Sequence, residues 1–233
     1  MNLSSLSTTG TSNSSLSFWS ATNGVLRARE WVVDPSGQRR IWLLTLTVVF
    51  GSLYGAIMGS LTLEPLQILY SAIKAPFLFM ASFGISLPSF FVLTTLLGLR
   101  HDFRTSVQAL IAAQSGFAVV LASLGPFTAF VYTSGLPYGK AVVWNGIMYF
   151  AASLGAQYLL RQLYAPLIAK DRRHRVLLFG WLVIYCFVAI QMAWMLRPFI
   201  GAPNLAPTFF RSGEFENAYE VVFQRVWGVL FGG

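Results

Sequence analysis

Five long stretches of the sequence contain no charged residue, and this feature restricts the fold more than any other. They cover residues 41–63, 75–99, 106–131, 142–160 and 176–196. A helix crosses the roughly 30 Å hydrocarbon core of a bilayer with about 20 apolar residues, which each stretch supplies. Charged residues make up only 10% of the chain, whereas soluble domains contain about 25%. The sequence therefore predicts an all-α membrane protein in which residues 41–200 form a bundle of five transmembrane helices.

Shorter features surround and interrupt these stretches. Residues 65–74 have helical spacing of apolar side chains, which indicates either a short interfacial helix after the first span or the opening turns of the second. Pro88 predicts a kink in the second span, and Gly125-Pro126 interrupts the third.

Two further segments flank the spans. Residues 1–40 form a Ser- and Thr-rich N-terminal segment. Residues 201–233 form a tail with prolines at its start, and from Ser212 onward the tail has an amphipathic helical pattern. We expect that helix to lie at the membrane interface through its apolar face, made of Phe215, Tyr219, Val222, Val226 and Trp227.

Basic residues gather on one side of the predicted membrane. Of the 16 Lys and Arg residues, eleven fall on the side of the N-terminus and five on the other. Basic residues mark cytoplasmic loops, so we expect a cytoplasmic N-terminus and an extracytoplasmic tail, in a multi-pass protein of a bacterial inner membrane. The densest group is predicted to bind anionic lipid headgroups: Arg161, Lys170, Arg172, Arg173 and Arg175. This placement explains the net charge of +8 without nucleic-acid binding.

Three glycines at intervals of four mark one face of the first span. Gly51, Gly55 and Gly59 form a glycine zipper, with Ser52 and Ala56 beside it. Small residues let helix backbones approach closely in a membrane, where lipid provides no hydrophobic drive for helix association. The face is predicted to pack against another helix, and two alternatives stay open. That helix belongs either to the same chain or to a second protein.

The spans offer few groups for chemistry. Their interiors contain no ionisable acid or base, which argues against proton relay and ion coupling through carboxylates. Ser115 would need a base to act as a nucleophile, and His101 and His174 lie at predicted cytoplasmic ends. We predict no catalytic residue, no metal site and no cofactor. The candidate polar path between spans consists of Gln114, Asn145, Gln157 and Gln191.

The segment at 97–121, LGLRHDFRTSVQALIAAQSGFAVVL, resembles the middle of the Yip family of five-span membrane proteins. Gly98, Phe103 and the small residues at 112–116 stand where that family has a polar turn, an aromatic residue and a small-residue-rich helix. The Asp-Leu-Tyr-Gly motif of its trafficking members is absent. The resemblance implies a non-enzymatic protein of membrane organisation or trafficking, often oligomeric, with no catalytic residues.

These observations support two hypotheses on function. The first is a non-enzymatic structural or assembly subunit that forms a homo-oligomer or associates with other membrane proteins through the glycine zipper. The alternative is a permease-like or lipid-handling protein that uses a polar path between spans. A pocket that reaches Gln114 or Asn145 would favour the second hypothesis.

Overall fold

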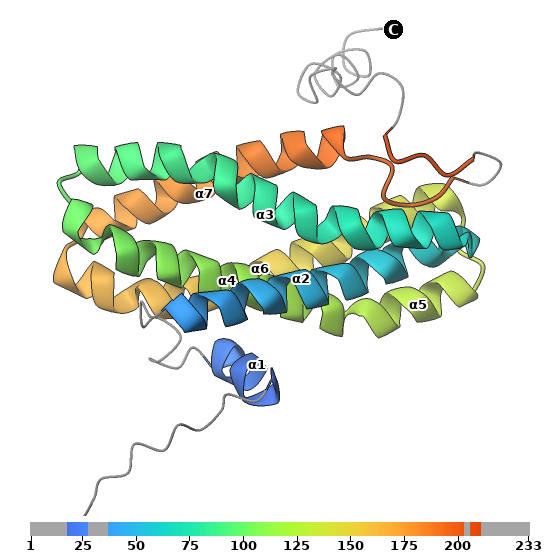
Figure 1. Cartoon of the computed structure of the whole chain (residues 1–233), viewed down its shortest axis with the longest axis horizontal. Helices are drawn as coiled ribbons and strands as arrows, with labels where there is room; N and C mark the ends of the chain where they lie inside the picture. The colour runs from blue at the N-terminus through green and yellow to red at the C-terminus, as the bar shows by residue number, and fades with distance from the viewer. Residues whose placement is uncertain (1–17, 28–36, 203–205, 211–233) are drawn as a thin grey trace, which may run out of the picture.

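The computed structural model describes residues 18–27, 37–202 and 206–210, and all regular secondary structure in these ranges is helical. Figure 1 shows long helices that run side by side along one axis. Their bounds are α1 (Phe18–Leu26), α2 (Gly37–Gly59), α3 (Pro65–Leu96), α4 (Phe103–Ser123), α5 (Gly125–Thr133), α6 (Tyr138–Lys170) and α7 (Arg173–Met195). Two 3-10 turns, Ser60–Thr62 and Arg100–Asp102, precede α3 and α4.

Among the described residues, four helical stretches are long and apolar enough to cross a membrane. They are Arg39–Thr62, Pro65–Leu96, Arg100–Thr133 and Arg173–Met195, which fits a multi-pass membrane protein. The predicted fourth span, at 142–160, lies within α6. This helix has 33 residues but is not among the four stretches that are apolar enough to cross a membrane. Asn145 and Gln157 lie within its uncharged stretch.

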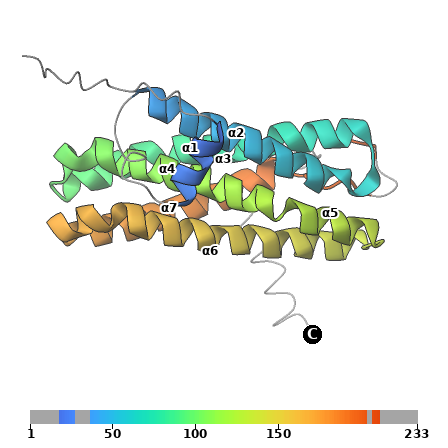
Figure 2. The ribbon, with the colours of Figure 1, turned by 90° about the horizontal axis from the view of Figure 1, so that it is seen from below.

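The long helices pack in a row. α7 packs on α3, α3 on α2, α2 on α4, and α4 on α6. α6 and α7, at the two ends of this row, make few contacts with each other although one short turn joins them. Figure 2 shows both on the same side of the bundle. Residues of α4 lie behind the space between these two helices.

The two ends of the bundle differ in charge. At one end α4 and α7 begin while α3 and α6 stop, and we call it the basic end. It carries Arg100, Arg104, Lys170, Arg172, Arg173 and Arg175, and Arg161 lies nine residues before it in α6. At the opposite end, the distal end, α2 turns into α3 and α5 turns into α6.

Residues 65–74 do not form a separate interfacial helix, which corrects the first of the two alternatives. They are the opening turns of α3, which continues through Pro76 and Pro88 to Leu96. Proline at the first helical position fits the start at Pro65, since that position needs no N–H. The apolar spacing was right, but Gln67, Ser71 and Lys74 on the polar face are buried. The break at Gly125-Pro126 is confirmed, because α4 ends at Ser123 and α5 begins at Gly125.

α1 was not expected, because the first 24 residues are rich in Ser, Thr and Asn. It lies against the side of the bundle, and Val25 is fully buried. A Cβ placed on Gly116 of α4 would stand 3.6 Å from Val25 Cγ1. The predicted amphipathic helix of the tail, with Phe215, Tyr219, Val222, Val226 and Trp227, lies outside the described residues.

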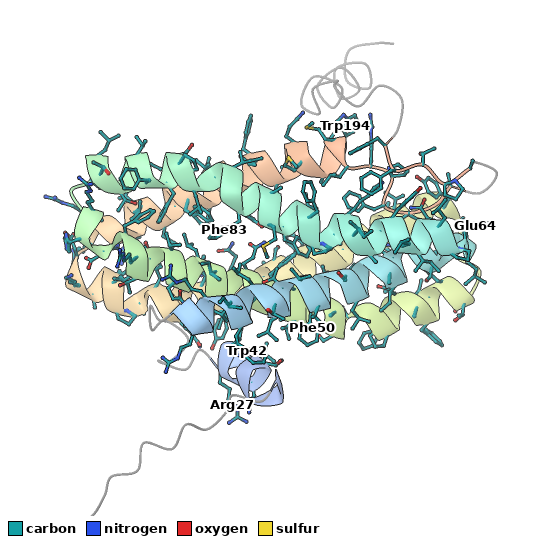
Figure 3. The ribbon with its side chains drawn as sticks, viewed as in Figure 1. Arg27, Trp42, Phe50, Glu64, Phe83 and Trp194 are labelled. Carbon is teal, nitrogen blue, oxygen red and sulfur yellow. The ribbon has the colours of Figure 1, made fainter. Side chains whose placement is uncertain are left out.

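Aromatic rings join α7 to α3, and Phe83 of α3 is labelled in Figure 3. The Trp181 ring of α7 makes edge contacts with Phe83 and Phe90 of α3, with centroid distances of 5.2 and 5.1 Å. Edge-to-face pairs add to the energy of simple burial. These contacts hold α7 on α3. The side of α7 that faces away from α3 makes few contacts with another helix.

Candidate functional site

The glycine zipper packs within the chain. A Cβ on Gly55 would stand 2.9 Å from Ala75 Cβ and would clash with Ser71 O, and one on Gly59 would stand 2.8 Å from Ser71 Cβ. A Cβ on Gly51 would lie 3.2 Å from Phe79 Cε2. The backbone of α3 therefore occupies the face that three missing side chains leave open. Of the two alternatives, the same chain provides the contacting helix, while Ser52 and Ala56 at its edge stay partly exposed.

The predicted headgroup cluster lies at the basic end. Arg172, Arg173 and Arg175 are exposed there, and Arg161 is exposed nine residues before the end of α6. Lys170 differs from them because its Nζ donates to both carboxylate oxygens of Asp102, at 2.7 and 2.9 Å. The pair ties the end of α6 to the turn before α4.

The two histidines of this end have different environments. His101 is exposed, and its Nε2 lies 2.9 Å from Asp102 Oδ2. His174 is fully buried, with its Nε2 3.3 Å from the same oxygen and its ring against Tyr164. Both were predicted to lie at the cytoplasmic ends of spans, and that prediction did not anticipate the burial of His174. The described residues include no group of three or more His, Cys, Asp or Glu side chains that could hold a metal ion.

Ser115 of α4 forms hydrogen bonds with α2. Its Oγ lies 2.7 Å from Leu43 O of α2 and 3.0 Å from Ile111 O of its own helix, and it accepts a bond from Thr47 Oγ1 at 3.2 Å. The two histidines lie at the basic end, in the turn before α4 and at the start of α7. In the structure, the hydroxyl of Ser115 serves to join α4 to α2.

Asn145 forms a closed hydrogen-bond network near the distal end. Its Oδ1 accepts from Tyr54 OH at 2.9 Å. Its Nδ2 donates to Tyr132 OH at 2.6 Å and to Ala141 O at 2.8 Å. These bonds join α2, α5 and α6. Because both atoms of the amide are occupied, Asn145 stabilises the bundle and leaves no polar group free for a ligand.

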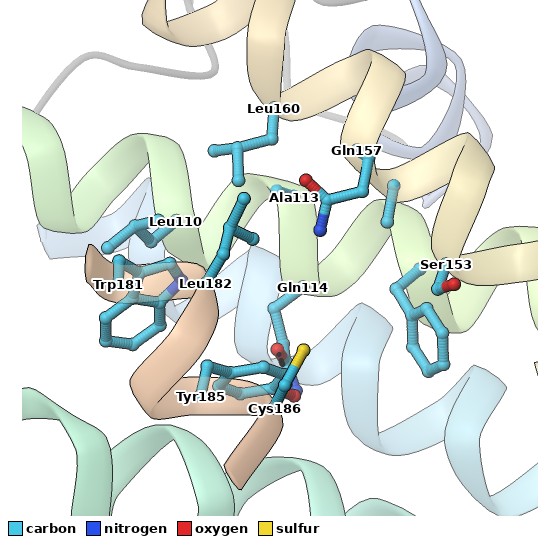
Figure 4. A pocket seen from close by; sticks show the side chains of 12 residues that line it. Leu110, Ala113, Gln114, Ser153, Gln157, Leu160, Trp181, Leu182, Tyr185 and Cys186 are labelled. Atoms are coloured by element: carbon cyan, nitrogen blue, oxygen red, sulfur yellow. Dashed lines mark hydrogen bonds between the residues drawn. The ribbon is translucent and has the colours of Figure 1, made fainter. Parts of the chain in front are cut away.

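Gln114 and Gln157, in contrast, line one pocket together. It has a volume of about 110 Å³ and lies between α4, α6 and α7, close to the opening between the last two (Figure 4). We call it the lateral pocket, and its walls include Leu110, Gln114, Ser153, Gln157, Trp181, Tyr185 and Cys186. Cys186 is exposed, so the pocket reaches the outer surface of the bundle. Asn145 and Gln191 are not among its lining residues.

One polar atom in this pocket has no partner. The Tyr185 hydroxyl donates to Gln114 Oε1 at 2.9 Å, which fixes the amide. Gln114 is only 9% exposed, and its Nε2 has no hydrogen-bond partner among the described residues. Trp181 stacks on Tyr185 with a centroid distance of 5.6 Å. The pocket therefore combines apolar and aromatic walls with one unused hydrogen-bond donor.

Sequence reasoning found the two glutamines of this pocket but not its aromatic wall. Trp181 and Tyr185 stand one helical turn apart on α7, a spacing that also fits simple core packing. Comparison of the chain with protein-family models, characterised proteins and solved structures finds no match. The Yip-family resemblance therefore stays a prediction.

Proposed function

We propose that this chain is a five-span, non-enzymatic membrane protein that binds an apolar molecule from the bilayer in the lateral pocket. α6 is the fifth span in this proposal. Its 33 residues extend about 50 Å at 1.5 Å per residue, more than the hydrocarbon thickness. It packs on α4, and Lys140 and Lys170 stand near its two ends. Five spans put the N-terminus in the cytoplasm and the tail outside, by the positive-inside rule.

The unpartnered amide of Gln114 is the observation that carries the proposal. Within a membrane, an unpaired polar group lacks water as a partner and is costly to bury. A ligand that accepts a hydrogen bond from Nε2 would offset this cost. The pocket that holds the amide reaches the surface at Cys186, beside the opening between α6 and α7. This position favours entry from the lipid and supports the lipid-handling hypothesis.

The assembly role stays a prediction that would need a surface other than the glycine zipper. α3 covers that face, so a second helix has no room there. The exposed arginines of the basic end support attraction of anionic headgroups, at about 1 kcal/mol for each residue near the membrane surface.

Cross-linking with a photoactivatable fatty acid tests the proposal. The full chain is reconstituted in liposomes with a fatty acid that carries a diazirine in its chain, and adducts are mapped by mass spectrometry. We expect adducts on the pocket walls, including Cys186. Ala156→Phe should reduce them several-fold, since Ala156 lines the pocket. Ala151→Phe is the matched control, because Ala151 is an exposed residue of the same helix and is not part of the lining.

Two results would contradict the proposal. Equal adduct yields in the two alanine variants would show that the fatty acid contacts only the outer surface. Rapid reaction of Cys186 with a charged, membrane-impermeant thiol reagent would indicate a water-filled path and a permease. Cys186 is the single cysteine of the chain, so the unaltered protein serves for this measurement.

A further inference from the structure

The depth of the lateral pocket restricts what can occupy it. Gln114 lies eleven residues after the start of α4 at Phe103, and Tyr185 lies twelve residues after the start of α7 at Arg173. At 1.5 Å per residue these distances correspond to about 17 and 18 Å from the basic end. The hydrocarbon core is roughly 30 Å thick, and the ester groups of phospholipids lie in the interfacial layers outside it. Gln114 therefore lies inside the predicted hydrocarbon layer, whereas Gln157, four residues before Arg161, lies near the basic-side edge of that layer, so an acceptor for Gln114 must reach inward past this edge.

The hydrogen-bonding pattern restricts the ligand further. The Tyr185 hydroxyl occupies Gln114 Oε1, so the free atom of the amide is the donor Nε2. A matching ligand must present an acceptor, such as a carbonyl oxygen, at this depth. Gln157 extends its amide into the same pocket from α6 and can contribute a second hydrogen bond (Figure 4).

The size of the pocket limits how much of a ligand can enter it. Its volume is about 110 Å³, whereas an apolar cavity that binds benzene measures about 150 Å³ and a water molecule takes about 30 Å³ of liquid. Because the pocket is smaller than the benzene-binding cavity, neither a whole lipid nor a complete ring fits inside it, but the edge of a ring can enter while the rest of the ring and an attached apolar tail lie in the opening between α6 and α7. The stacked pair of Trp181 and Tyr185 lines the site with aromatic surface.

We infer that the lateral pocket binds a molecule of the quinone type, with a ring-sized carbonyl group on an apolar tail. This inference rests on the proposed function and specifies its ligand. The ring carbonyl accepts a hydrogen bond from Gln114 Nε2, and the tail lies in the surrounding lipid. Binding here requires no electron transfer.

Competition against the photoactivatable fatty acid tests the inference on the unaltered chain in liposomes. Decylubiquinone is the expected ligand, and 1-decyl-4,5-dimethoxy-2-methylbenzene is its matched control, with the same tail, methyl group and methoxy groups but no carbonyl. Decylubiquinone should displace the photoprobe from the pocket at a concentration about three- to tenfold lower, which corresponds to one net hydrogen bond. In Gln114→Leu this difference should disappear, whereas Gln191→Leu, outside the pocket lining, should retain it.

The outcomes separate this inference from the proposed function. Equal competition by both compounds, or competition by neither while the photoprobe still labels the pocket, overturns the quinone-type ligand and leaves lipid binding standing. Absence of photoprobe adducts from the pocket overturns both. Since the two compounds are compared on the unaltered protein, a folding defect in Gln114→Leu does not decide the result.

Discussion

At the scale of single residues, two side-chain amides, those of Asn145 and Gln114, differ in how many of their atoms form hydrogen bonds. Asn145 uses its oxygen and its nitrogen in bonds to Tyr54, Tyr132 and Ala141. Gln114 uses only its oxygen, in the bond from Tyr185. A hydrogen bond between membrane helices is worth roughly 0.6 kcal/mol on average. Asn145 therefore contributes to stability, and Gln114 is the better candidate for binding.

Gly55 provides a test of packing at a single atom. In Gly55→Ala the added Cβ would meet Ala75 Cβ at 2.9 Å and the backbone carbon of Ser71 at 3.0 Å. The added Cβ can be accommodated only if the backbone of α3 moves. We therefore expect a loss of about 1–3 kcal/mol in the free energy of unfolding, as for other overpacked sites. Thermal unfolding of the purified chain in mild detergent measures this loss.

Gly84→Ala is the control for that substitution. Gly84 is an exposed residue of α3, and a Cβ there would meet nothing within 4 Å. Alanine should leave the stability unchanged or raise it by up to about 1 kcal/mol through its helix propensity. If both variants unfolded at the same temperature as the original chain, the close approach of α2 and α3 would be wrong.

At the scale of elements, the segment after α7 is held on the opening turns of α3. Lys74 Nζ donates to Pro198 O at 2.9 Å and lies 4.8 Å from the centre of the Phe209 ring. Gln67 Nε2 donates to Phe199 O at 3.2 Å, and Ser71 Oγ donates to the same carbonyl. These contacts bury the polar face of residues 65–74, which explains why the segment is part of α3 and not an interfacial helix.

Lys74→Met should loosen this segment without changing the helices. Methionine keeps the apolar volume but leaves Pro198 O without its charged donor, a bond worth about 1.5–3 kcal/mol. We expect faster hydrogen–deuterium exchange in residues 199–202. Lys140→Met provides the comparison, since Lys140 is exposed at the start of α6. Exchange that increases equally in both variants would mean that Lys74 does not anchor the segment.

The sequence predicted the elements better than it predicted their contacts. Uncharged runs of about 20 residues have few options other than helices, so four membrane-length helices and the break at Gly125-Pro126 are confirmed. The burial of Lys74 depends on a segment more than 120 residues away in the chain. The lateral pocket depends on three helices whose order in the row no single run of sequence specifies. α1 went unrecognised because it has only nine residues, with Ser, Thr, Asn and Gly among them, and the burial of Val25 depends on contact with the rest of the bundle.

At the scale of the whole molecule, the row of helices explains why a pocket exists. α6 packs on α4, and α7 packs on α3, so the two helices that end the row make few contacts with each other, and the lateral pocket lies between them and α4. Where helices close a bundle completely, side chains fill the interior at the density of organic crystals. In this unclosed row the lateral pocket stays unfilled by side chains.

The role of α6 as a fifth span can be tested by the sidedness of its two ends. Ser134, in the turn before α6, and Arg172, in the turn after it, are exposed. Single cysteines, Ser134→Cys and Arg172→Cys, are introduced with Cys186→Ser as background and exposed to a membrane-impermeant maleimide. If α6 crosses the bilayer and the basic end is cytoplasmic, Ser134→Cys should react almost completely in intact cells. Arg172→Cys should react only after the cells are opened. Labelling of both from the same side would mean that α6 does not span the membrane, and the lateral pocket would then lack one of its two lipid-facing walls.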